Sequence, residues 1–504
     1  MELTDEQKQV VSFIKANSNT NIGIEASAGC GKTSTLLECL KQLPIKNKVK
    51  FYAFSNVIAN ELKEKVPSTA KVSTVHATGY SVLNENCNRL ILSEGKVAGF
   101  VSKYAKKNPK LDKKFIHHVT ELLQKHSLTL LDLSDESLTA TCNRFSINVC
   151  PSWYVYVREV QSIIDKYNEK NLNTVLKIDF NDMVVLPIKY DLQFTQYDTV
   201  FMDEAQDMGE CHKEILLRSV KPNGRFVVVY DRRQNIFSFA SADIRVLDGL
   251  LLRGNASIYS LSYSFRCAKS IVSHCLSVYG NFKPFKDNKQ GDVKNGSIKD
   301  IQGRSEAVLC RNTKPLFDVY AYLAGKGISS YIKGKDFGQE LIKLLKKYRG
   351  ENPFTTAMQL DNYLSDIENS LFGVGVSKPK LTKKYIAEYE KVIIIKKVLA
   401  NTNSVSDSIK KLTTIFTEKG KGIPLMTIHK SKGLEFDSVF VVRNDLLPSK
   451  YAETKDEIIQ ERNLDWVLRS RAKNKLTYIT DFIGDAKIEQ VQASKLHKDS
   501  NIWV

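Results

Sequence analysis

The stretch that decides the fold spans residues 21–33 and reads Asn21-Ile22-Gly23-Ile24-Glu25-Ala26-Ser27-Ala28-Gly29-Cys30-Gly31-Lys32-Thr33. Residues 21–25 predict a short strand, and helix-forming residues follow at 34–43. A strand, a glycine-rich loop and a helix in this order form the context that a phosphate-binding loop requires. The sequence therefore predicts an α/β domain with this loop at one edge of its sheet.

The residue types within the loop match the binding of a nucleoside triphosphate. Gly29 and Gly31 let backbone N–H groups turn toward phosphate oxygens, and the start of the helix adds its dipole. Lys32 supplies a positive charge to the β- and γ-phosphates, and the Thr33 hydroxyl suits Mg²⁺. Ala26 stands where the full pattern has glycine. The alternative is a glycine-rich turn that binds nothing.

Length and charge set the broad class. A chain of 504 residues exceeds a single hydrophobic core, so we expect two to four domains. The formal net charge of +18 favours a polyanionic partner, nucleic acid before a membrane surface, over a generally basic solvated surface. No apolar run reaches the roughly 18 residues of a membrane span. Residues 1–6 are acidic and polar, unlike a signal peptide.

The cysteines and histidines indicate an intracellular protein without a zinc site. Nine cysteines are scattered without a Cys-x-x-Cys pair, which favours free thiols in a reducing interior, cytoplasmic for a bacterial or phage protein. His117, His118 and His126 are candidate metal ligands. Because they lie among lysines and without a cysteine or carboxylate at ligand spacing, we interpret them as a solvated helix face.

Alternating strand and helix patterns predict two α/β halves, each interrupted by a helical, lysine-rich stretch. Strand-like runs at 48–55, 71–75, 199–202 and 226–229 belong to the first half. Runs at 307–310, 424–428 and 438–442 belong to the second. The predicted segments are 1–83, 84–189 (first insertion), 190–262, 263–340, 341–417 (second insertion) and 418–504.

Two acidic residues follow the predicted strand at 199–202. Parallel strands end at the same edge of a sheet, so Asp203 and Glu204 are expected beside the phosphate-binding loop. Asp203 suits Mg²⁺ held through water, and Glu204 suits orienting and deprotonating the attacking water. The alternative is a helix N-cap.

The loop after the next strand reads Asp231-Arg232-Arg233-Gln234-Asn235-Ile236-Phe237-Ser238-Phe239. Gln234 is a candidate contact for the γ-phosphate or the attacking water. Phe237 and Phe239 alternate, so both rings project the same way. They suit stacking on nucleic-acid bases, or one face of a buried strand.

Transfer of a phosphoryl group spreads negative charge that an arginine from a neighbouring domain stabilises. Arg266 and Arg471 are the candidates, and each is also readable as an ordinary surface arginine.

Together these motifs resemble superfamily 1 helicases of the UvrD/Rep/PcrA group, especially the F-box DNA helicase branch and its phage and bacterial relatives. The resemblance covers almost the whole chain. Thr427-Ile428-His429-Lys430-Ser431-Lys432-Gly433-Leu434-Glu435-Phe436 is the closest match, to motif V. The Walker A motif of this group begins with alanine, as Ala26 does here.

The resemblance implies two RecA-like P-loop domains, each with a mainly helical insertion, and a role for each matching residue. It assigns nucleotide binding to Gln7 (adenine), to Ala26, Ser27, Ala28, Gly29, Cys30, Gly31, Lys32, Thr33 and Ser34, to Phe265 (adenine stacking) and to Glu435 (ribose). It assigns catalysis to Lys32, Glu204, Gln234, Arg266 and Arg471, and metal binding to Thr33 and Asp203. It assigns DNA contacts to Phe54, Asn56, His76, Phe237, Phe239 and His429.

The implied activity is ATP-dependent and Mg²⁺-dependent 3′→5′ movement on single-stranded DNA with strand separation, as used in replication, repair and recombination. The implied partners are single-stranded DNA and duplex junctions, with single-strand-binding or recombinase proteins as further candidates, and no membrane. A translocase that removes proteins from single strands and unwinds poorly is the first alternative, and a non-hydrolysing ATP-gated DNA clamp is the second. Three departures stand out: Tyr230 replaces the usual glycine of motif III, Arg469 competes with Arg471, and the second insertion is about half the usual size.

Overall fold

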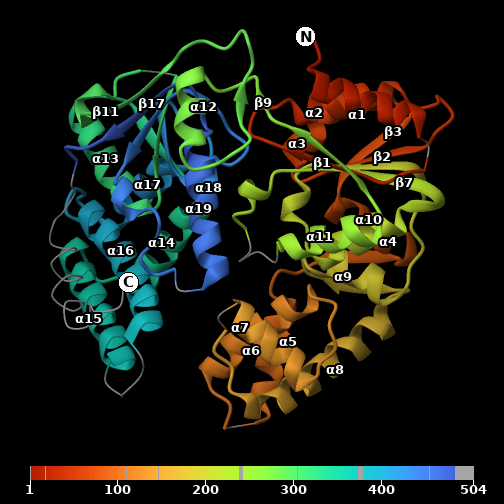
Figure 1. The fold of residues 1–504 in the computed structure, drawn as a ribbon. Coiled ribbons are helices and arrows are strands. Elements are labelled where there is room, and N and C mark those ends of the chain that lie inside the picture. The colour runs from red at the N-terminus through yellow and green to blue at the C-terminus, as the bar shows by residue number, and fades with distance from the viewer. Residues whose placement is uncertain are drawn as a thin grey trace, which may run out of the picture. The chain divides into compact units, whose positions relative to one another are not determined.

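A computed structural model describes residues 2–17, 19–108, 110–145, 147–237, 242–303, 305–372, 378–452 and 454–482. The chain divides into two compact units, Met1–Tyr263 and Ser264–Val504, and Figure 1 shows the elements of each. Both units contain a parallel β-sheet, so the predicted α/β fold class is confirmed. Among the described residues, the helices are all too short or too polar to cross a membrane.

The first unit is built on a six-stranded parallel sheet of order β3-β2-β6-β7-β1-β8. Its strands are β1 (Ile22–Ala26), β2 (Val49–Ala53), β3 (Ala70–Thr74), β6 (Tyr197–Met202), β7 (Val220–Tyr230) and β8 (Ser257–Leu261). Its helices are α1 (Asp5–Ala16), α2 (Lys32–Lys41), α3 (Asn56–Lys65), α4 (Val75–Asn86), α9 (Asp182–Lys189), α10 (Glu210–Arg218) and α11 (Ile244–Arg253). Short 3₁₀ helices are η2 (Ala205–Asp207) and η3 (Arg232–Gln234).

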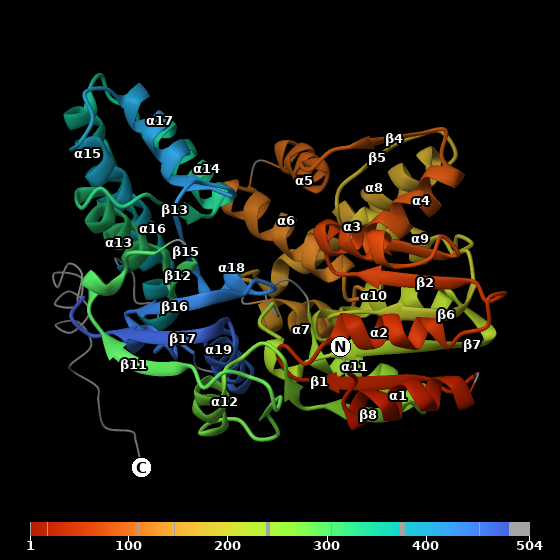
Figure 2. The same ribbon diagram turned by 90° about the horizontal axis from the view of Figure 1, so that it is seen from above.

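Successive residues of the central strands point to opposite faces of this sheet, and both faces are buried. In β7, Val227 and Val229 pack with α1, α2 and α3 on one face, whereas Phe226 and Val228 pack with α4, α9, α10 and α11 on the other. Figure 1 shows the helices of the two faces on opposite sides of the sheet, and Figure 2 views this unit from the side of α1 and α2. Because the central strands are buried on both faces, their sequences are almost continuously apolar rather than alternating.

A helical subdomain is inserted between α4 and α9. It comprises β4 (Arg89–Leu92), α5 (Lys96–Lys106), α6 (Lys113–Ser127), α7 (Asp135–Phe145), η1 (Pro151–Trp153), α8 (Tyr154–Asn171) and β5 (Val175–Ile178). Its helices share a separate core that includes Phe115, Leu122 and Val157. The sequence indicated a helical segment here and missed the two strands, which pair in parallel at its base.

The second unit contains a seven-stranded parallel sheet of order β11-β17-β16-β12-β15-β13-β14. Its strands are β11 (Asp292–Gly296), β12 (Glu306–Cys310), β13 (Ser330–Lys333), β14 (Phe416–Thr417), β15 (Ile423–Thr427), β16 (Phe436–Val442) and β17 (Ala472–Ile479). A separate two-stranded sheet is formed by β9 (Tyr263–Ser264) and β10 (Lys283–Pro284). Its helices are α12 (Lys269–Leu276), α13 (Thr313–Gly325), α14 (Lys335–Lys347), α15 (Pro353–Phe372), α16 (Lys378–Leu399), α17 (Val405–Ile415), α18 (Ile428–Ser431) and α19 (Lys455–Arg469), with η5 (Ile298–Asp300) and η6 (Asn444–Leu446).

The helices of the second insertion share the core of this sheet. Leu341 of α14, Ile395 of α16 and Leu412 of α17 are fully buried in the same apolar cluster as Val308 of β12. Helices α14, α16 and α17 therefore pack directly in the core of this sheet, and residues 416–417 form the edge strand β14.

Candidate functional site

The phosphate-binding loop connects β1 to α2 in the first unit. Gly29 and Gly31 have φ angles of 70° and 76°, in the left-handed region that favours glycine. The start of the loop is held at the end of the neighbouring strand β8 by a hydrogen bond from the Ser27 N–H to the Leu261 carbonyl (2.9 Å). Ala26 and Ala28 are fully buried and Cys30 nearly so, whereas Lys32 begins the helix.

Lys32 meets the acidic pair at the end of β6. Its Nζ lies 2.9 Å from Glu204 Oε1, and both side chains are largely buried. The Thr33 hydroxyl lies 3.4 Å from Asp203 Oδ2. Burial by itself lowers the pKa of Lys32, but the carboxylates of Glu204, Asp203 and Asp231 outweigh it and raise that pKa, so Lys32 stays charged.

The two carboxylates differ in environment. Burial and then the negative charge of Glu204 raise the pKa of Asp203 to about 6. Asp203 and Thr33 together offer a carboxylate and a hydroxyl oxygen, the donor types that Mg²⁺ prefers. Glu204 adopts a left-handed backbone conformation (φ 53°), which costs a non-glycine residue energy and turns its side chain toward Lys32.

Asp231 and Gln234 follow β7, the strand beside β6, and join the same network. Gln234 Nε2 donates to Asp231 Oδ2 (2.9 Å), and the Asp231 N–H donates to Gln206 Oε1 (3.0 Å). Gln206 Nε2 in turn donates to Glu204 Oε2. Gln234 is thus connected to Glu204 through two intervening residues, and its side chain is buried in this structure.

Gln7 lies beneath the loop. Its Nε2 donates to Thr35 Oγ1 (2.9 Å) and to the Cys30 carbonyl (3.4 Å), while its Oε1 accepts the Thr4 N–H in a capping box. With 3% of its surface exposed, Gln7 braces the phosphate-binding loop in this structure. Its predicted contact with adenine stays a prediction.

A cleft of about 710 Å³ in the first unit joins the acidic pair to three of the predicted DNA-contacting residues. Phe54, His76 and Phe237 line it together with Asp203 and Glu204. The rings of Phe54 and Phe237 are nearly parallel with centroids 6.3 Å apart, and Phe54 is half-exposed. Asn56 is exposed at the start of α3 and is not among the lining residues, and Phe239 lies outside the described residues.

Sequence reasoning missed two aromatic residues of this cleft. The Phe180 ring, 58% exposed, stacks on His76 with centroids 4.1 Å apart, and His212 meets His76 edge-on at 5.5 Å. Burial lowers the pKa of His76 to about 4, and burial and then His76 lower that of His212 to about 3. Phe180 lies in the chain segment before α9, and nothing in its local sequence marks its ring as exposed.

In the second unit, three predicted nucleotide-site residues lie at one edge of the sheet. Arg266 Nε donates to Glu435 Oε2 (2.6 Å), and Arg266 Nη1 donates to the Ser470 carbonyl (3.2 Å). Burial opposes ionisation of Glu435, but Lys473 and Arg266 outweigh it and lower its pKa. Glu435 and Arg471 immediately precede β16 and β17, so both lie at the amino edge of this parallel sheet.

The two arginines of motif VI have different surroundings. Arg471 is 1% exposed and donates to the carbonyls of Val467 and Leu434 and to Ser470 Oγ at 3.0–3.1 Å. Arg469 is paired with Asp465 and donates to the His274 carbonyl. Elsewhere, Phe265 packs against Phe285 with ring centroids 4.6 Å apart.

His429 lies apart from this group. It follows the carboxyl end of β15, whereas Glu435 and Arg471 precede the amino ends of their strands. Burial, and then the Arg311 charge, lower the pKa of His429 to about 4. The second unit therefore separates its predicted DNA contact from its predicted nucleotide contacts across the sheet.

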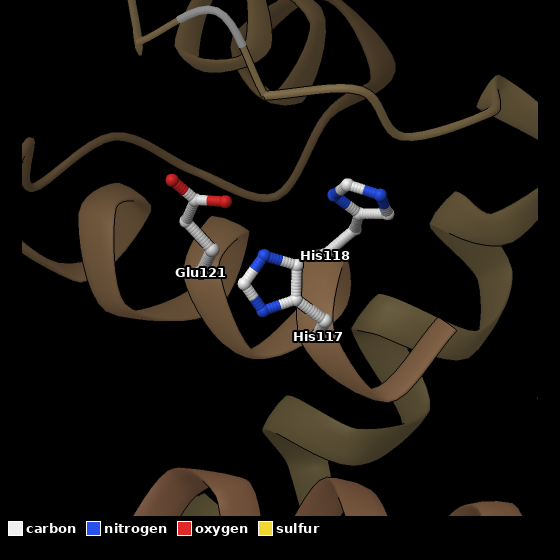
Figure 3. A group of neighbouring side chains, drawn as sticks. All are labelled: His117, His118 and Glu121. Atoms are coloured by element: carbon white, nitrogen blue, oxygen red, sulfur yellow. The ribbon is translucent and has the colours of Figure 1, made fainter. Parts of the chain in front are cut away.

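The histidines of the first insertion require two corrections. The imidazoles of His117 and His118 and the carboxylate of Glu121, all on α6, place their ligand atoms within 4.8 Å of one another. Figure 3 shows these three side chains. The prediction that these histidines have no carboxylate at ligand spacing was wrong, because Glu121 is four residues after His117 and shares its helix face. His126 is buried and hydrogen-bonded through both ring nitrogens, to Thr141 Oγ1 and the Asp132 carbonyl, so its interpretation as part of a solvated helix face was wrong.

Residues 3–251 match the family model of the UvrD/REP helicase N-terminal domain. The chain is also similar to F-box DNA helicase protein 1 of Schizosaccharomyces pombe (25% identical; 94% of this chain, 57% of that protein) and to F-box DNA helicase 1 of Gallus gallus (23%; 88% and 44%). A third relative is the ATP-dependent DNA helicase Rep of Buchnera aphidicola (20%; 95% and 94%).

These matches assign residues 3–251 to the UvrD/REP helicase family and support a UvrD-like superfamily 1 helicase. The resemblance inferred from its motifs is thereby confirmed, and the two parallel sheets agree with the two RecA-like domains of this family. The chain spans about half the length of the F-box relatives that it matches.

Proposed function

We propose that this family member is an ATP-dependent 3′→5′ single-stranded DNA translocase and DNA helicase. The observation that supports the proposal is that the predicted nucleotide site and the aromatic cleft of the first unit share two residues, Asp203 and Glu204. The phosphate-binding loop and the acids Asp203 and Glu204 meet at the carboxyl edge of the sheet, and the same acids line a cleft with exposed aromatic rings. Relatives named as DNA helicases support the choice of substrate.

In this proposal each part of the loop has one task. The N–H groups around Gly29 and Gly31 and the Lys32 ammonium bind the β- and γ-phosphates. Thr33 and Asp203 hold Mg²⁺, which neutralises charge on the phosphate oxygens. Glu204 orients the attacking water and accepts its proton, while Gln234 contacts that water or the terminal phosphate.

The second unit supplies charge stabilisation and further contacts. Arg266 and Arg471 stabilise the negative charge that spreads over the transferring phosphoryl group. Phe265 and Glu435 contact adenine and ribose, respectively. For Arg266 and Glu435, this requires exchange of their mutual ion pair for nucleotide contacts.

The aromatic cleft of the first unit is the proposed track for single-stranded DNA. Every base presents a π-face, so stacking on Phe54, Phe237 and Phe239 grips a strand without reading its sequence. Phe180 and His76 extend the platform, since their rings already stack on one another. His76 is neutral at pH 7 and therefore contributes a ring rather than a charge.

We also propose the domain division 1–83, 84–189, 190–262, 263–340, 341–417 and 418–504, in which the second and fifth segments are accessory insertions. The small second insertion motivates the alternative of a translocase that strips proteins from single strands with little unwinding.

The test is phosphate release with no nucleic acid, single-stranded DNA, single-stranded RNA, and duplexes bearing 3′ or 5′ tails. We expect stimulation by single-stranded DNA and unwinding of the 3′-tailed duplex alone. Stimulation without unwinding, together with clearance of a recombinase filament, would favour the stripping activity. Nucleotide binding without any phosphate release would refute the enzymatic proposal and leave a DNA clamp, and Lys32→Ala is the matched control for contaminating ATPases.

A further inference from the structure

Arg233 contacts the phosphate-binding loop from η3. Its Nη2 donates to Ser27 Oγ at 2.7 Å, and its Nε donates to Asp231 Oδ1 at 3.2 Å. Ser27 is the second residue of the loop motif and is almost fully buried. The guanidinium therefore contacts the start of the phosphate-binding loop at Ser27, and Arg233 belongs to the same unit as Lys32.

The contacts of Arg233 form part of a closed ring of hydrogen bonds, in which Asp231 accepts from Arg233 with its carboxylate and donates to Gln206 with its backbone N–H. From Asp231 the ring continues through Gln206 to Glu204, and from Glu204 to Lys32. It leaves the phosphate-binding loop at Ser27 and returns to it at Lys32. Because Glu204 is the proposed base, its place in the ring puts Arg233 on the side of the terminal phosphate, where water attacks.

The neighbouring Arg232 gives a natural comparison. Its Nη1 lies 2.7 Å from Asp248 Oδ1, and its Nε lies 3.7 Å from Glu25 Oε1. Arg232 is thus engaged with acids outside the loop, although it carries the same charge one residue away. Replacing either arginine by glutamine removes the same single positive charge, so the two variants differ only in the contacts that are lost.

We propose that Arg233 binds the terminal phosphate of the nucleoside triphosphate, as a guanidinium supplied in cis. The inference rests on the proposed nucleotide site and names a contact that its motif-based residues do not include. Ser27 Oγ is a neutral acceptor, whereas a phosphate oxygen is charged, and charge-assisted hydrogen bonds are about twice as strong. Nη2 exchanges the hydroxyl for a phosphate oxygen while Nε stays on Asp231, which keeps the planar group oriented.

The experiment compares the affinity of the full chain for a non-hydrolysable ATP analogue and for ADP, both with Mg²⁺, by titration calorimetry. The variants are Arg233→Gln, Arg233→Lys and Ser27→Ala, with Arg232→Gln as the matched control. Loss of a charge-assisted hydrogen bond predicts a roughly 10- to 100-fold weaker binding of the triphosphate for Arg233→Gln. ADP affinity should change by less than about threefold, since ADP lacks the terminal phosphate.

The remaining variants separate phosphate binding from bracing of the loop. Arg233→Lys keeps the charge without the fork, so its loss should be intermediate. Ser27→Ala removes the hydroxyl partner and should keep the wild-type preference for triphosphate over diphosphate. Equal losses for both nucleotides in Arg233→Gln, or the same selective loss in Ser27→Ala, would overturn the inference.

Two further readings keep this outcome distinct from that of the proposed function. Thermal unfolding checks that each variant is folded, and Arg233→Lys replaces Arg233→Gln if the latter is not. If the wild type binds neither nucleotide, the proposed function itself fails. If it binds both and Arg233→Gln shows no selective loss, only the role of Arg233 fails.

Discussion

Replacing Glu204 by glutamine tests the proposed chemistry most directly. The substitution keeps the shape of the side chain and removes the carboxylate that accepts the proton from water. In the structure, Glu204 Oε1 also pairs with Lys32 (2.9 Å), and Oε2 accepts a hydrogen bond from Gln206. One side chain therefore has two separable tasks, proton transfer and neutralisation of Lys32.

The expected magnitude follows from these tasks. Losing a positioned general base slows the chemical step by about 10²- to 10⁴-fold, which is about 2.7–5.4 kcal/mol in the activation barrier. Lys32 keeps the charges of Asp203 and Asp231, so the loss of stability stays below the roughly 3–5 kcal/mol of a buried charge stripped of its partner. Because Glu204 no longer competes for Lys32, we expect ATP affinity to be unchanged or slightly higher.

The assay measures single-turnover phosphate release with saturating single-stranded DNA, and nucleotide affinity separately by calorimetry. Glu214→Gln is the control, because Glu214 is an acid on α10 that pairs with Arg218. A near-normal rate in Glu204→Gln would show that another residue activates the water. An equal fall in ATP affinity would show that Glu204 acts by shaping the loop rather than as a base.

Three further predictions concern the rest of the molecule. Phe239→Ala should keep basal ATPase activity and weaken single-stranded DNA binding by about 1–3 kcal/mol, the value of one base stack; an equal loss of basal activity, measured without DNA, would make Phe239 a core residue. Arg471→Ala should lower the maximal ATPase rate strongly. It also removes the Arg471 donor from the Leu434 carbonyl at about 1–3 kcal/mol, whereas the Val467 carbonyl keeps a hydrogen bond from the Ser470 hydroxyl. Arg469→Ala should be mild in both respects or, if Arg469 contacts a phosphate, weaken DNA binding in a salt-dependent way, with a smaller salt slope than the wild type. The reverse pattern in kinetics and thermal unfolding would refute the motif VI assignment. Burial depresses the pKa values of His76 and His212 below the usual 6.5, so the unfolded chain binds more protons than the folded chain between about pH 4 and 6.5. The free energy of unfolding should therefore fall as the pH falls through this window. Urea unfolding of His212→Gln should show a smaller pH dependence of this free energy than the wild type, and an unchanged dependence would contradict the burial argument.

The sequence by itself determined the fold class and the residues at the ends of the strands. Loop glycines, lysine and threonine after an apolar strand have few other uses, and paired acids after another strand point to the same edge. Local patterns of this kind predict which residues gather at one edge of the sheet, because a parallel sheet brings the carboxyl ends of its strands together. The strand predicted at 199–202 lies within β6, and the one at 226–229 lies within the longer β7.

Only the tertiary structure decided which side chains meet across the chain. Lys32 and Glu204 are 172 residues apart, and Arg233 reaches Ser27 over 206 residues, so no spacing rule could pair them. The exposure of Phe180, the burial of Arg471 and the opposite edges of His429 and Glu435 likewise depend on neighbours distant in sequence. The reason is physical: periodicity reports which face of an element is apolar, but the surroundings of a polar side chain depend on every element that packs beside it.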